Sequence, residues 1–261
     1  MTADTNNSRV RSGSRGPAAW PGNAIAAISL TYDDGLPDGL DRAIPDLNQR
    51  GIRGTFYLTV GDRKVRKRSE DWRRAFEGGH EIGNHTVRHP CRADAYPYPP
   101  LWLPRALRLE NWSPEDIARE ISEAAGWLNE EIGPDPGRTF AHPCGATSIG
   151  SPPDDVSYDA AIRRHHFAAR AGVGEPNDPR SVDLMRIRSH LCDHPDIREL
   201  IAYCEGAIRT GGWAVLMFHS IGGRRMRTRR SVHRELLGYL ADQRFWVAPV
   251  RDVASFLRHS R

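Results

Sequence analysis

The sequence predicts an α/β fold in which parallel strands are joined by helical crossovers, as in an open doubly wound sheet or a barrel. Strand-like apolar runs alternate with helix-like stretches along the chain, and chemically rich polar residues follow several of those runs. The 261 residues are enough for one large core. Barrel enzymes carry their sites at the carboxyl ends of the strands, so the candidate residues agree with this fold class.

The first half of the chain contains three strand-like runs with helices between them. The run AIAAISLTYDDG, which starts at residue 24, is apolar and ends in acidic residues and glycine, as a buried strand opening into a loop does. We expect a helix over 40–50, and the β-branched and aromatic GTFYLTV predicts the next strand. A second helix is expected over 70–77, followed by a short strand in HEIGN that leads into a loop or a helix start.

The second half begins with a segment, residues 91–114, that is rich in proline and aromatic residues and lacks any period. We interpret it as an inserted loop. The helix that follows has Ser113 as a candidate N-cap and Pro114 at its first position. Further strand-like runs are TFAHPCG, HHFAARAG, LMRIRSH, GGWAVLMFHSIG and FWVAPV, and helices are predicted over 159–164, 196–210, 231–243 and at the end of the chain.

Composition excludes several classes of function. Charged residues make up 27% of the chain and its net charge is +4, as in an ordinary globular protein. The basic clusters at 63–74 and 224–230 lack interleaved aromatic residues that could stack on bases, so we interpret them as solvated loops and predict no nucleic-acid binding. No apolar stretch approaches the roughly 18 residues of a membrane span. The oligomeric state is left open.

The amino-terminal residues 1–23 are polar and glycine-rich, which predicts a flexible leader. They lack the apolar region of a secretory signal, so the expected location is cytoplasmic. The four cysteines, Cys91, Cys144, Cys192 and Cys204, show no C-x-x-C spacing. In the absence of a signal peptide we expect free thiols, although a disulfide between two of them stays an alternative.

Asp33 and Asp34 end the first strand, in TYDDG. Adjacent side chains on a strand point in different directions, so one carboxylate can bind a metal ion while the other acts on water. A nearby cation would also relieve the repulsion between them. The alternative is an ordinary turn or helix cap.

His85 and His89 are four residues apart in HTVRH, so on a helical turn both would reach one ion. Imidazole suits zinc, cobalt, nickel or iron, and a carboxylate as third ligand would leave a coordination position open. Two surface histidines are the alternative.

His219 ends the apolar run WAVLMF, where it is either a general acid at the rim or a core histidine.

Together these motifs resemble the polysaccharide deacetylases, the family 4 carbohydrate esterases, with TYDDG at 31–35, HTVRH at 85–89, AHPCG at 141–145 and LMFH at 216–219. The resemblance implies a distorted, TIM-like (β/α) barrel of about seven strands within a catalytic domain over residues 24–261. It implies a divalent metal, usually zinc, with cobalt or nickel as alternatives, and removal of acetyl groups from an N-acetylated carbohydrate.

The resemblance also assigns roles to individual residues. Asp33 matches the general base and His219 the general acid. Asp34, His85 and His89 match the metal ligands, and the backbone N–H of Cys144 matches a donor to the oxyanion. Rival functions are hydrolysis of a formamide, a cyclic amide or an acetyl ester, and a non-catalytic glycan-binding barrel.

Two positions depart from the family pattern. The arginine of the third motif aligns with Ala141, and we hypothesise that Arg170, on the next strand, supplies a guanidinium instead. The aspartate that orients the acid histidine has no clean counterpart, and Asp183 is a candidate. Aromatic residues of the insertion either stack on sugars or pack over the barrel mouth; they are Tyr96, Tyr98, Trp102 and Trp112.

Overall fold

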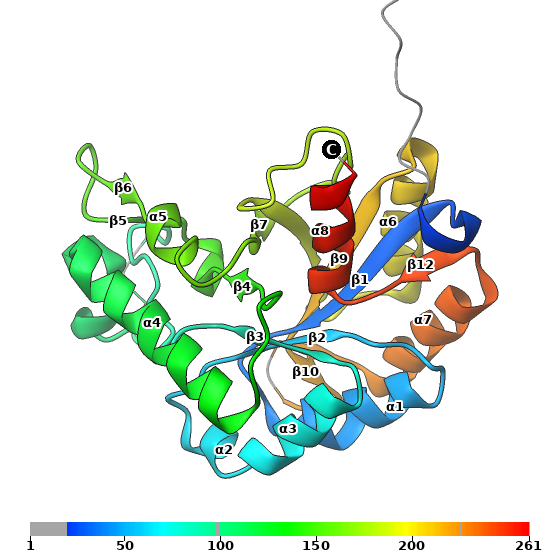
Figure 1. The fold of residues 1–261 in the computed structure, drawn as a ribbon, viewed down its shortest axis with the longest axis horizontal. Coiled ribbons are helices and arrows are strands. Elements are labelled where there is room, and N and C mark those ends of the chain that lie inside the picture. Colours follow the sequence, from blue (N-terminus) through cyan, green and yellow to red (C-terminus); the bar gives the residue numbers. More distant parts are fainter. Residues whose placement is uncertain (1–19, 98–99, 225, 261) are drawn as a thin grey trace, which may run out of the picture.

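The computed structural model describes residues 20–97, 100–224 and 226–260. Its centre is a closed barrel of parallel strands, which confirms the predicted barrel and excludes the open sheet (Figure 1). Around the barrel the strands are β1 (Ala26–Tyr32), β2 (Thr55–Leu58), β3 (Glu81–Asn84), β4 (Phe140–Ala141), β7 (Ala169–Val173), β8 (Ile187–Leu191) and β9 (Trp213–Phe218). β9 pairs with β1 and closes the ring of seven.

The barrel is distorted at β1, which pairs with three strands. One edge pairs with β9 over Ala27–Tyr32. On the other edge, the first half pairs with β12 (Phe245–Val247), and β2 pairs with Thr31 and Tyr32. All these pairs are parallel, so the carboxyl ends of the strands share one rim.

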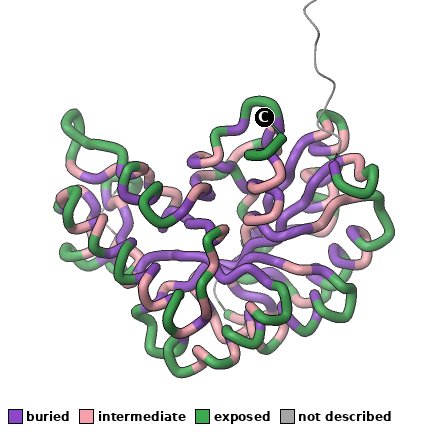
Figure 2. Tube along the Cα trace, in the orientation of Figure 1, coloured by how far each residue is buried: buried purple, intermediate pink, exposed green. Residues whose placement is uncertain are grey.

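Helices cover the outside of the barrel because the strands turn apolar side chains outward. Ile28, Leu30 and Tyr32 of β1 pack in one buried cluster with Leu47 and Leu236 of the surrounding helices. The helices are α1 (Ile44–Asn48), preceded by the π-helical turn η2 (Gly39–Ala43), α2 (Arg63–Arg66), α3 (Ser69–Glu77), α4 (Pro114–Glu131), α5 (Asp159–Ile162), α6 (Ile197–Thr210), α7 (Arg230–Asp242) and α8 (Val250–His259). Burial follows the strands and the inner helix faces (Figure 2).

Helix α4 begins where the sequence predicts. The Ser113 hydroxyl accepts a hydrogen bond from the Asp116 N–H, and the Asp116 carboxylate accepts one from the Ser113 N–H. This reciprocal capping box satisfies two amide donors that would otherwise lack a partner at a helix start. The apolar face of α4, which includes Ile121 and Leu128, is buried.

The amino-terminal end of the barrel is closed by helix α8. The backbone N–H of Val250 donates to Thr55 Oγ1 and that of Arg251 donates to the Glu81 carboxylate, both at 2.8–2.9 Å. Thr55 and Glu81 are the first residues of β2 and β3. This end is therefore sealed, and the opposite rim remains for a site.

Trp20, which precedes β1, is packed against the barrel. Residues 1–19 lie outside the described residues, but Trp20 is only 3% exposed and packs on Trp246 and Phe256. Its indole N–H donates to the Gly211 carbonyl at 2.9 Å. The exposed turn η1 (Pro21–Asn23) then leads toward β1.

Several short turns and strands lie outside the barrel strands. The insertion carries two 3-10 turns, η3 (Arg105–Leu107) and η4 (Leu109–Asn111), and is anchored at its start, where Cys91 exchanges backbone hydrogen bonds with Leu107 and Leu109. The turn η5 (Pro143–Gly145) follows β4. Two small strand pairs complete the rim, β5 (Ser148–Ile149) with β6 (Val156–Ser157) and β10 (Ser220–Ile221) with β11 (Arg227–Thr228). Among the described helices, none has the length and apolar character to span a membrane.

Candidate metal and acid–base site

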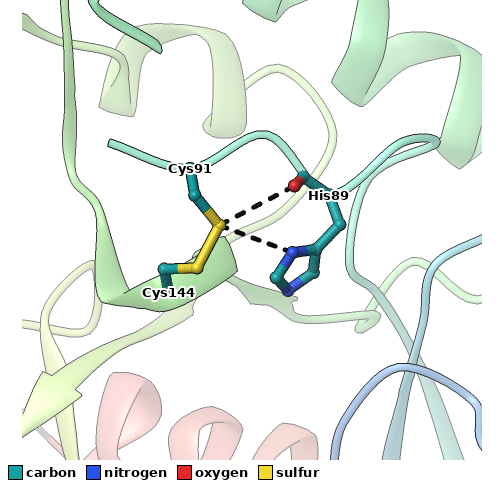
Figure 3. Close-up of side chains that lie close together, drawn as sticks. All are labelled: His89, Cys91 and Cys144. Carbon is teal, nitrogen blue, oxygen red and sulfur yellow. Dashed lines mark hydrogen bonds between the residues drawn. A yellow bond between two sulfur atoms is a disulfide. The ribbon is translucent and has the colours of Figure 1, made fainter. Parts of the chain in front are cut away.

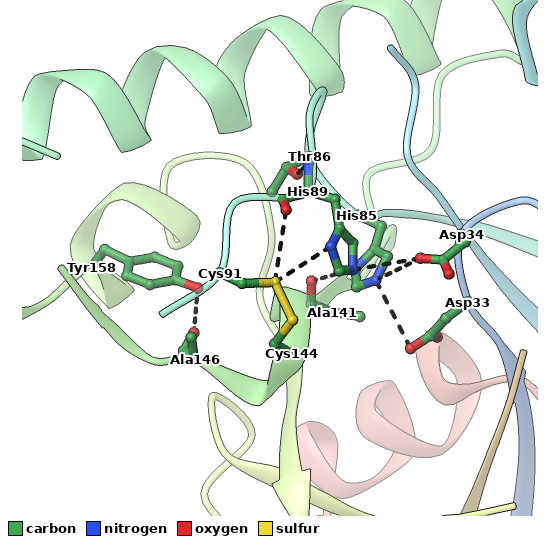
Figure 4. Close-up of a disulfide and its surroundings, with 10 residues drawn as sticks. All are labelled: Asp33, Asp34, His85, Thr86, His89, Cys91, Ala141, Cys144, Ala146 and Tyr158. Carbon is green, nitrogen blue, oxygen red and sulfur yellow. Dashed lines mark hydrogen bonds and ion pairs between the residues drawn. A yellow bond between two sulfur atoms is a disulfide. The ribbon is translucent and has the colours of Figure 1, made fainter. Parts of the chain in front are cut away.

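The predicted site residues converge at the carboxyl rim of the barrel from four strands. Asp33 and Asp34 follow β1, and His85 and His89 follow β3. The other two are Cys144, in the turn after β4, and His219, directly after β9. Figure 4 shows the carboxylates of Asp33 and Asp34 facing the two imidazoles.

Asp34, His85 and His89 are arranged as ligands of a single cation. Asp34 Oδ1 lies 3.7 Å from His85 Nε2 and 3.5 Å from His89 Nε2. A tetrahedral ion with metal–nitrogen and metal–oxygen bonds of about 2.0–2.2 Å separates its ligand atoms by about 3.4 Å. The three side chains therefore fit a divalent metal, and three protein ligands leave a coordination position open.

The loop that carries the histidines is not the helical turn that the spacing predicts. Thr86 and His89 have positive φ angles of 67° and 57°. Side chains stabilise this shape, because the Asn84 amide oxygen accepts from the Thr86 N–H at 2.8 Å and Thr86 Oγ1 accepts from the His89 N–H at 3.0 Å. The two imidazoles meet through this compact loop, with ring centroids 4.8 Å apart.

Helix α4 holds the same loop from outside through Glu120, a residue that sequence reasoning missed. Its buried carboxylate accepts from the backbone N–H groups of Val87 and Arg88 and pairs with the Arg88 guanidinium at 2.7 Å. A glutamate in the middle of an amphipathic helix gives no sequence signal for this role. Its position on the buried face between Ile117 and Ile121 is the only hint.

His85 is held with one nitrogen free for a metal. Its Nδ1 lies 2.9 Å from the Ala141 carbonyl oxygen, so this nitrogen carries the proton and donates it. Burial lowers the pKa of His85 to about 3, with the neighbouring His89 and Arg170 acting in the same direction against Asp33. The imidazole is neutral at ordinary pH, and the Nε2 lone pair faces Asp34.

Asp34 stands in a strained conformation, with a φ angle of 70° that points its carboxylate at the histidines. Burial raises its pKa to about 6, and the adjacent Asp33 acts in the same direction against His219. A carboxylate that protonates so readily is one that a bound cation would stabilise.

Asp33 is paired with the guanidinium of Arg170, which reaches it from β7. Burial alone would raise the pKa of Asp33, but the charge and hydrogen bond of Arg170, together with the charges of His85 and His219, lower the pKa below its ordinary value. Asp33 is 4% exposed. Ala141 lies opposite Arg170 in the β4–β7 register, so the guanidinium comes from the strand beside the one that carries the third motif.

Arg170 leaves part of the aspartate available. Asp33 Oδ2 faces the guanidinium and lies 3.9 Å from His85 Nε2, whereas Oδ1 is buried without a hydrogen-bond partner among the described residues. The Arg170 guanidinium also lies over the Tyr57 ring, 5.3 Å from its centroid. Asp33 is thus an ionised carboxylate with one oxygen free beside the candidate metal site.

His219 is half-buried after β9, and its Nδ1 has no hydrogen-bond partner among the described residues. It is close enough to influence the pKa values of both Asp33 and Asp34. Asp183 is not brought to it: this carboxylate is exposed in the turn before β8 and accepts from the Met185 N–H at 2.9 Å. The Asp183 carboxylate therefore stabilises its own turn.

The expectation of free thiols is wrong for two of the four cysteines. Cys91 and Cys144 form a disulfide with a Cα–Cα distance of 5.8 Å (Figures 3 and 4), because the start of the insertion lies against the turn after β4. Cys192 and Cys204 are free, as expected, and both are buried. Cys144 has a φ angle of 54°. The backbone hydrogen bonds within this turn are donated by the N–H groups of Gly145 and Ala146, and the Cys144 N–H takes no part in them.

Comparisons with known proteins place the chain in a family. The protein-family model described as polysaccharide deacetylase matches residues 23–156. A curated gellan lyase from Bacillus sp. is 26% identical over 172 residues, which are 66% of this chain and only 6% of that protein's length.

Three solved structures share the fold. A candidate polysaccharide deacetylase from Mycobacterium smegmatis superposes with a TM-score of 0.66 at 16% identity, over 94% of both chains. Peptidoglycan deacetylase PdaC from Bacillus subtilis has a TM-score of 0.54 at 17% identity, over 90% of this chain and 93% of that one. A family 4 acetyl xylan esterase from Clostridium thermocellum, in complex with cobalt, has a TM-score of 0.56 at 18% identity, over 88% and 90%. Because the family model matches more than half of the chain, residues 23–156, the chain belongs to the polysaccharide deacetylase family.

Proposed function

We propose that this protein is a metal-dependent hydrolase that removes acetyl groups from an N-acetylated amino sugar or polysaccharide. The observation that carries the proposal is the placement of an ionised aspartate, Asp33, beside a three-ligand cation site made by Asp34, His85 and His89. A structural site would be closed by four protein ligands.

We assign the bound cation to zinc, with cobalt and nickel as alternatives, because two imidazoles and one carboxylate suit these ions. When bound, the ion would act as a Lewis acid on the acetyl carbonyl and raise the acidity of water. Family membership and the cobalt complex of the related esterase support a divalent metal.

The residues of the chain divide the remaining work. Asp33 accepts the proton of the attacking water, and Arg170 keeps that carboxylate ionised before the reaction. The Cys144 N–H donates to the oxygen on which negative charge develops, a contribution of roughly 3–4 kcal/mol for one preorganised donor. His219, which follows β9 beside β1, donates a proton to the departing amine.

The proposal is tested by acetate release from N-acetylglucosamine oligomers with the zinc- or cobalt-loaded protein. Asp33→Asn and His219→Ala should each lower kcat by about 10²-fold or more while the metal stays bound. Asp178→Asn is a matched control, because this partly exposed carboxylate follows β7 in a turn and pairs with Arg180 beside it.

A parallel assay on acetylated xylan and on small cyclic imides separates the amide substrate from its rivals. Turnover of xylan esters without turnover of the oligomers would assign the site to an esterase. Metal binding without turnover of any substrate would favour a glycan-binding barrel.

A further inference from the structure

His89 belongs to two groups of metal-ligating side chains at once. Its Nε2 faces Asp34 Oδ1 at 3.5 Å, and its Nδ1 faces the Cys91 sulfur, also at 3.5 Å. The second group consists of His89, Cys91 and Cys144, whose ligand atoms all lie within 4.8 Å of one another (Figure 3). The proposed acetamide hydrolysis makes no use of the two sulfur atoms.

We propose that reduction of the Cys91–Cys144 disulfide creates a second metal site from the two thiolates and His89 Nδ1, and that this site competes with the Asp34–His85–His89 site for His89. The ligand is a thiophilic divalent cation such as zinc or cadmium, because thiolate and imidazole ligands select such ions. The existence of this site does not depend on the proposed function, but its effect on catalysis does.

The spacing of nitrogen and sulfur fits such an ion. With zinc–nitrogen bonds of about 2.0–2.1 Å and zinc–sulfur bonds of about 2.3 Å, a tetrahedral site separates these two atoms by about 3.5 Å. The distance from Cys91 Sγ to His89 Nδ1 already has this value. Cys144 lies on the same side of the imidazole, as Figure 3 shows.

The two cysteines differ in solvent exposure, which determines the sulfur that a reductant attacks first. Cys144 is exposed, whereas Cys91 is fully buried beneath the insertion. A thiolate of a dithiol reductant attacks the Cys144 sulfur, the S–S bond breaks, and its electron pair goes to Cys91. The second thiol of the reductant then releases Cys144, so the protein gains two electrons and two protons and the reductant becomes a disulfide. The incoming cation displaces the two thiol protons.

The two sites exclude each other because a neutral imidazole has one protonated nitrogen and one lone pair. Coordination through Nε2, toward Asp34, requires the proton on Nδ1. Coordination through Nδ1, toward the sulfurs, places the proton on Nε2, where it faces Asp34 and no longer offers a ligand. The reduced chain would therefore retain an ion while the Asp34–His85–His89 site loses one of its three ligands.

Cobalt(II) binding tests the inference without an activity assay. The oxidised and the dithiol-reduced proteins, freed of reductant under nitrogen, are titrated with cobalt and followed by absorption. The reduced wild type should show an intense thiolate-to-cobalt charge-transfer band, and the oxidised protein should not. The control is the reduced Cys91→Ser/Cys144→Ser variant, which keeps the buried Cys192 and Cys204 and should lack the band.

His89→Ala in the reduced protein should weaken cobalt binding at the thiolates by about 10-fold or more, since one of three ligands is lost. Equal charge-transfer bands in the reduced wild type and the double serine variant would overturn the inference. So would an unchanged affinity in His89→Ala, or a loss of the far-ultraviolet helix signal when the disulfide is reduced.

Acetate release separates this inference from the proposed function. Reduction should lower the activity of the metal-loaded wild type by about 10-fold or more and leave the double serine variant as it was. If the oxidised protein releases no acetate but the reduced one gains the band, the proposed function fails and the second site stands. If activity is present and insensitive to reduction in both proteins, competition for His89 is refuted.

Discussion

Replacing Arg170 by methionine tests how Asp33 is kept ionised. The substitution keeps most of the side-chain volume and removes the only guanidinium that contacts Asp33 among the described residues. Burial, the largest influence on this carboxyl, which is 4% exposed, is then opposed only by the charges of His85 and His219, so the pKa rises. A larger fraction of the base is then protonated at a given pH.

The cost to stability can be bounded. A carboxyl with an unfolded pKa of about 3.9 costs about 4 kcal/mol to protonate at pH 7, because each pH unit above that pKa adds about 1.4 kcal/mol. This ceiling agrees with the 3–5 kcal/mol typically lost when one partner of a buried ion pair is removed. At pH 5 the same ceiling is about 1.5 kcal/mol.

The pH dependence therefore has a definite sign. In the wild type the depressed pKa of Asp33 contributes stability above the unfolded pKa of about 3.9, which is lost as pH falls through the folded pKa. In Arg170→Met the folded pKa is raised, so the variant loses stability relative to the wild type as pH rises. Urea unfolding at pH 5 and 7 measures the difference, and Arg170→Met/Asp33→Asn should remove most of it.

Activity gives the second readout. Arg170→Met should lower kcat/KM by about 10²-fold or more at pH 6, and the loss should shrink at higher pH as Asp33 ionises. Metal binding should persist, since Arg170 is not one of the three ligands. An unchanged pH profile, together with a stability loss equal at pH 5 and 7, would refute the role given to the Asp33–Arg170 pair.

Three other perturbations follow from described contacts. Zinc affinity should fall about tenfold per pH unit below about 6, where Asp34 rather than His85 takes up the proton, and calorimetric titration at pH 5 and 7 should detect it. Glu120→Gln should weaken zinc binding by about 10–100-fold through the loosened histidine loop, whereas Glu123→Gln on the exposed face of α4 should not; equal affinities would contradict the support role. Trp20→Ala should destabilise the fold by about 3–5 kcal/mol in urea unfolding, while a change below 1 kcal/mol would mean that residues 20–23 add little to the domain.

The alternating fold and the candidate metal site follow from local patterns. Alternating strand and helix signals predict parallel strands, and polar residues after β1, β3 and β9 then necessarily meet at one rim. Closure into a ring required the family resemblance, because a pattern of periods does not distinguish an open sheet from a barrel.

Contacts made across large sequence separations could not be predicted in the same way. Cys91 and Cys144 are 53 residues apart in the sequence, and their pairing depends on the insertion lying against the turn after β4. The absence of C-x-x-C spacing has no bearing on it. The His85–His89 geometry depends on positive φ angles fixed by Asn84 and Thr86 rather than on helical spacing. Arg170 could be proposed because a strand neighbour of Ala141 was the natural place for a displaced charge.

The pairing of β1 on both sides constrains how the chain can fold during synthesis. β1 is synthesised before two of its three partners, β9 and β12, whose paired residues lie 186 and 219 positions later in the sequence. Until those residues emerge, β1 has unpaired edges, and Asp33 and Asp34 at its end lack the strand from which His219 comes. The ring therefore closes only after β9 has been made, and until then the nascent protein must keep the apolar strand β1 from pairing wrongly.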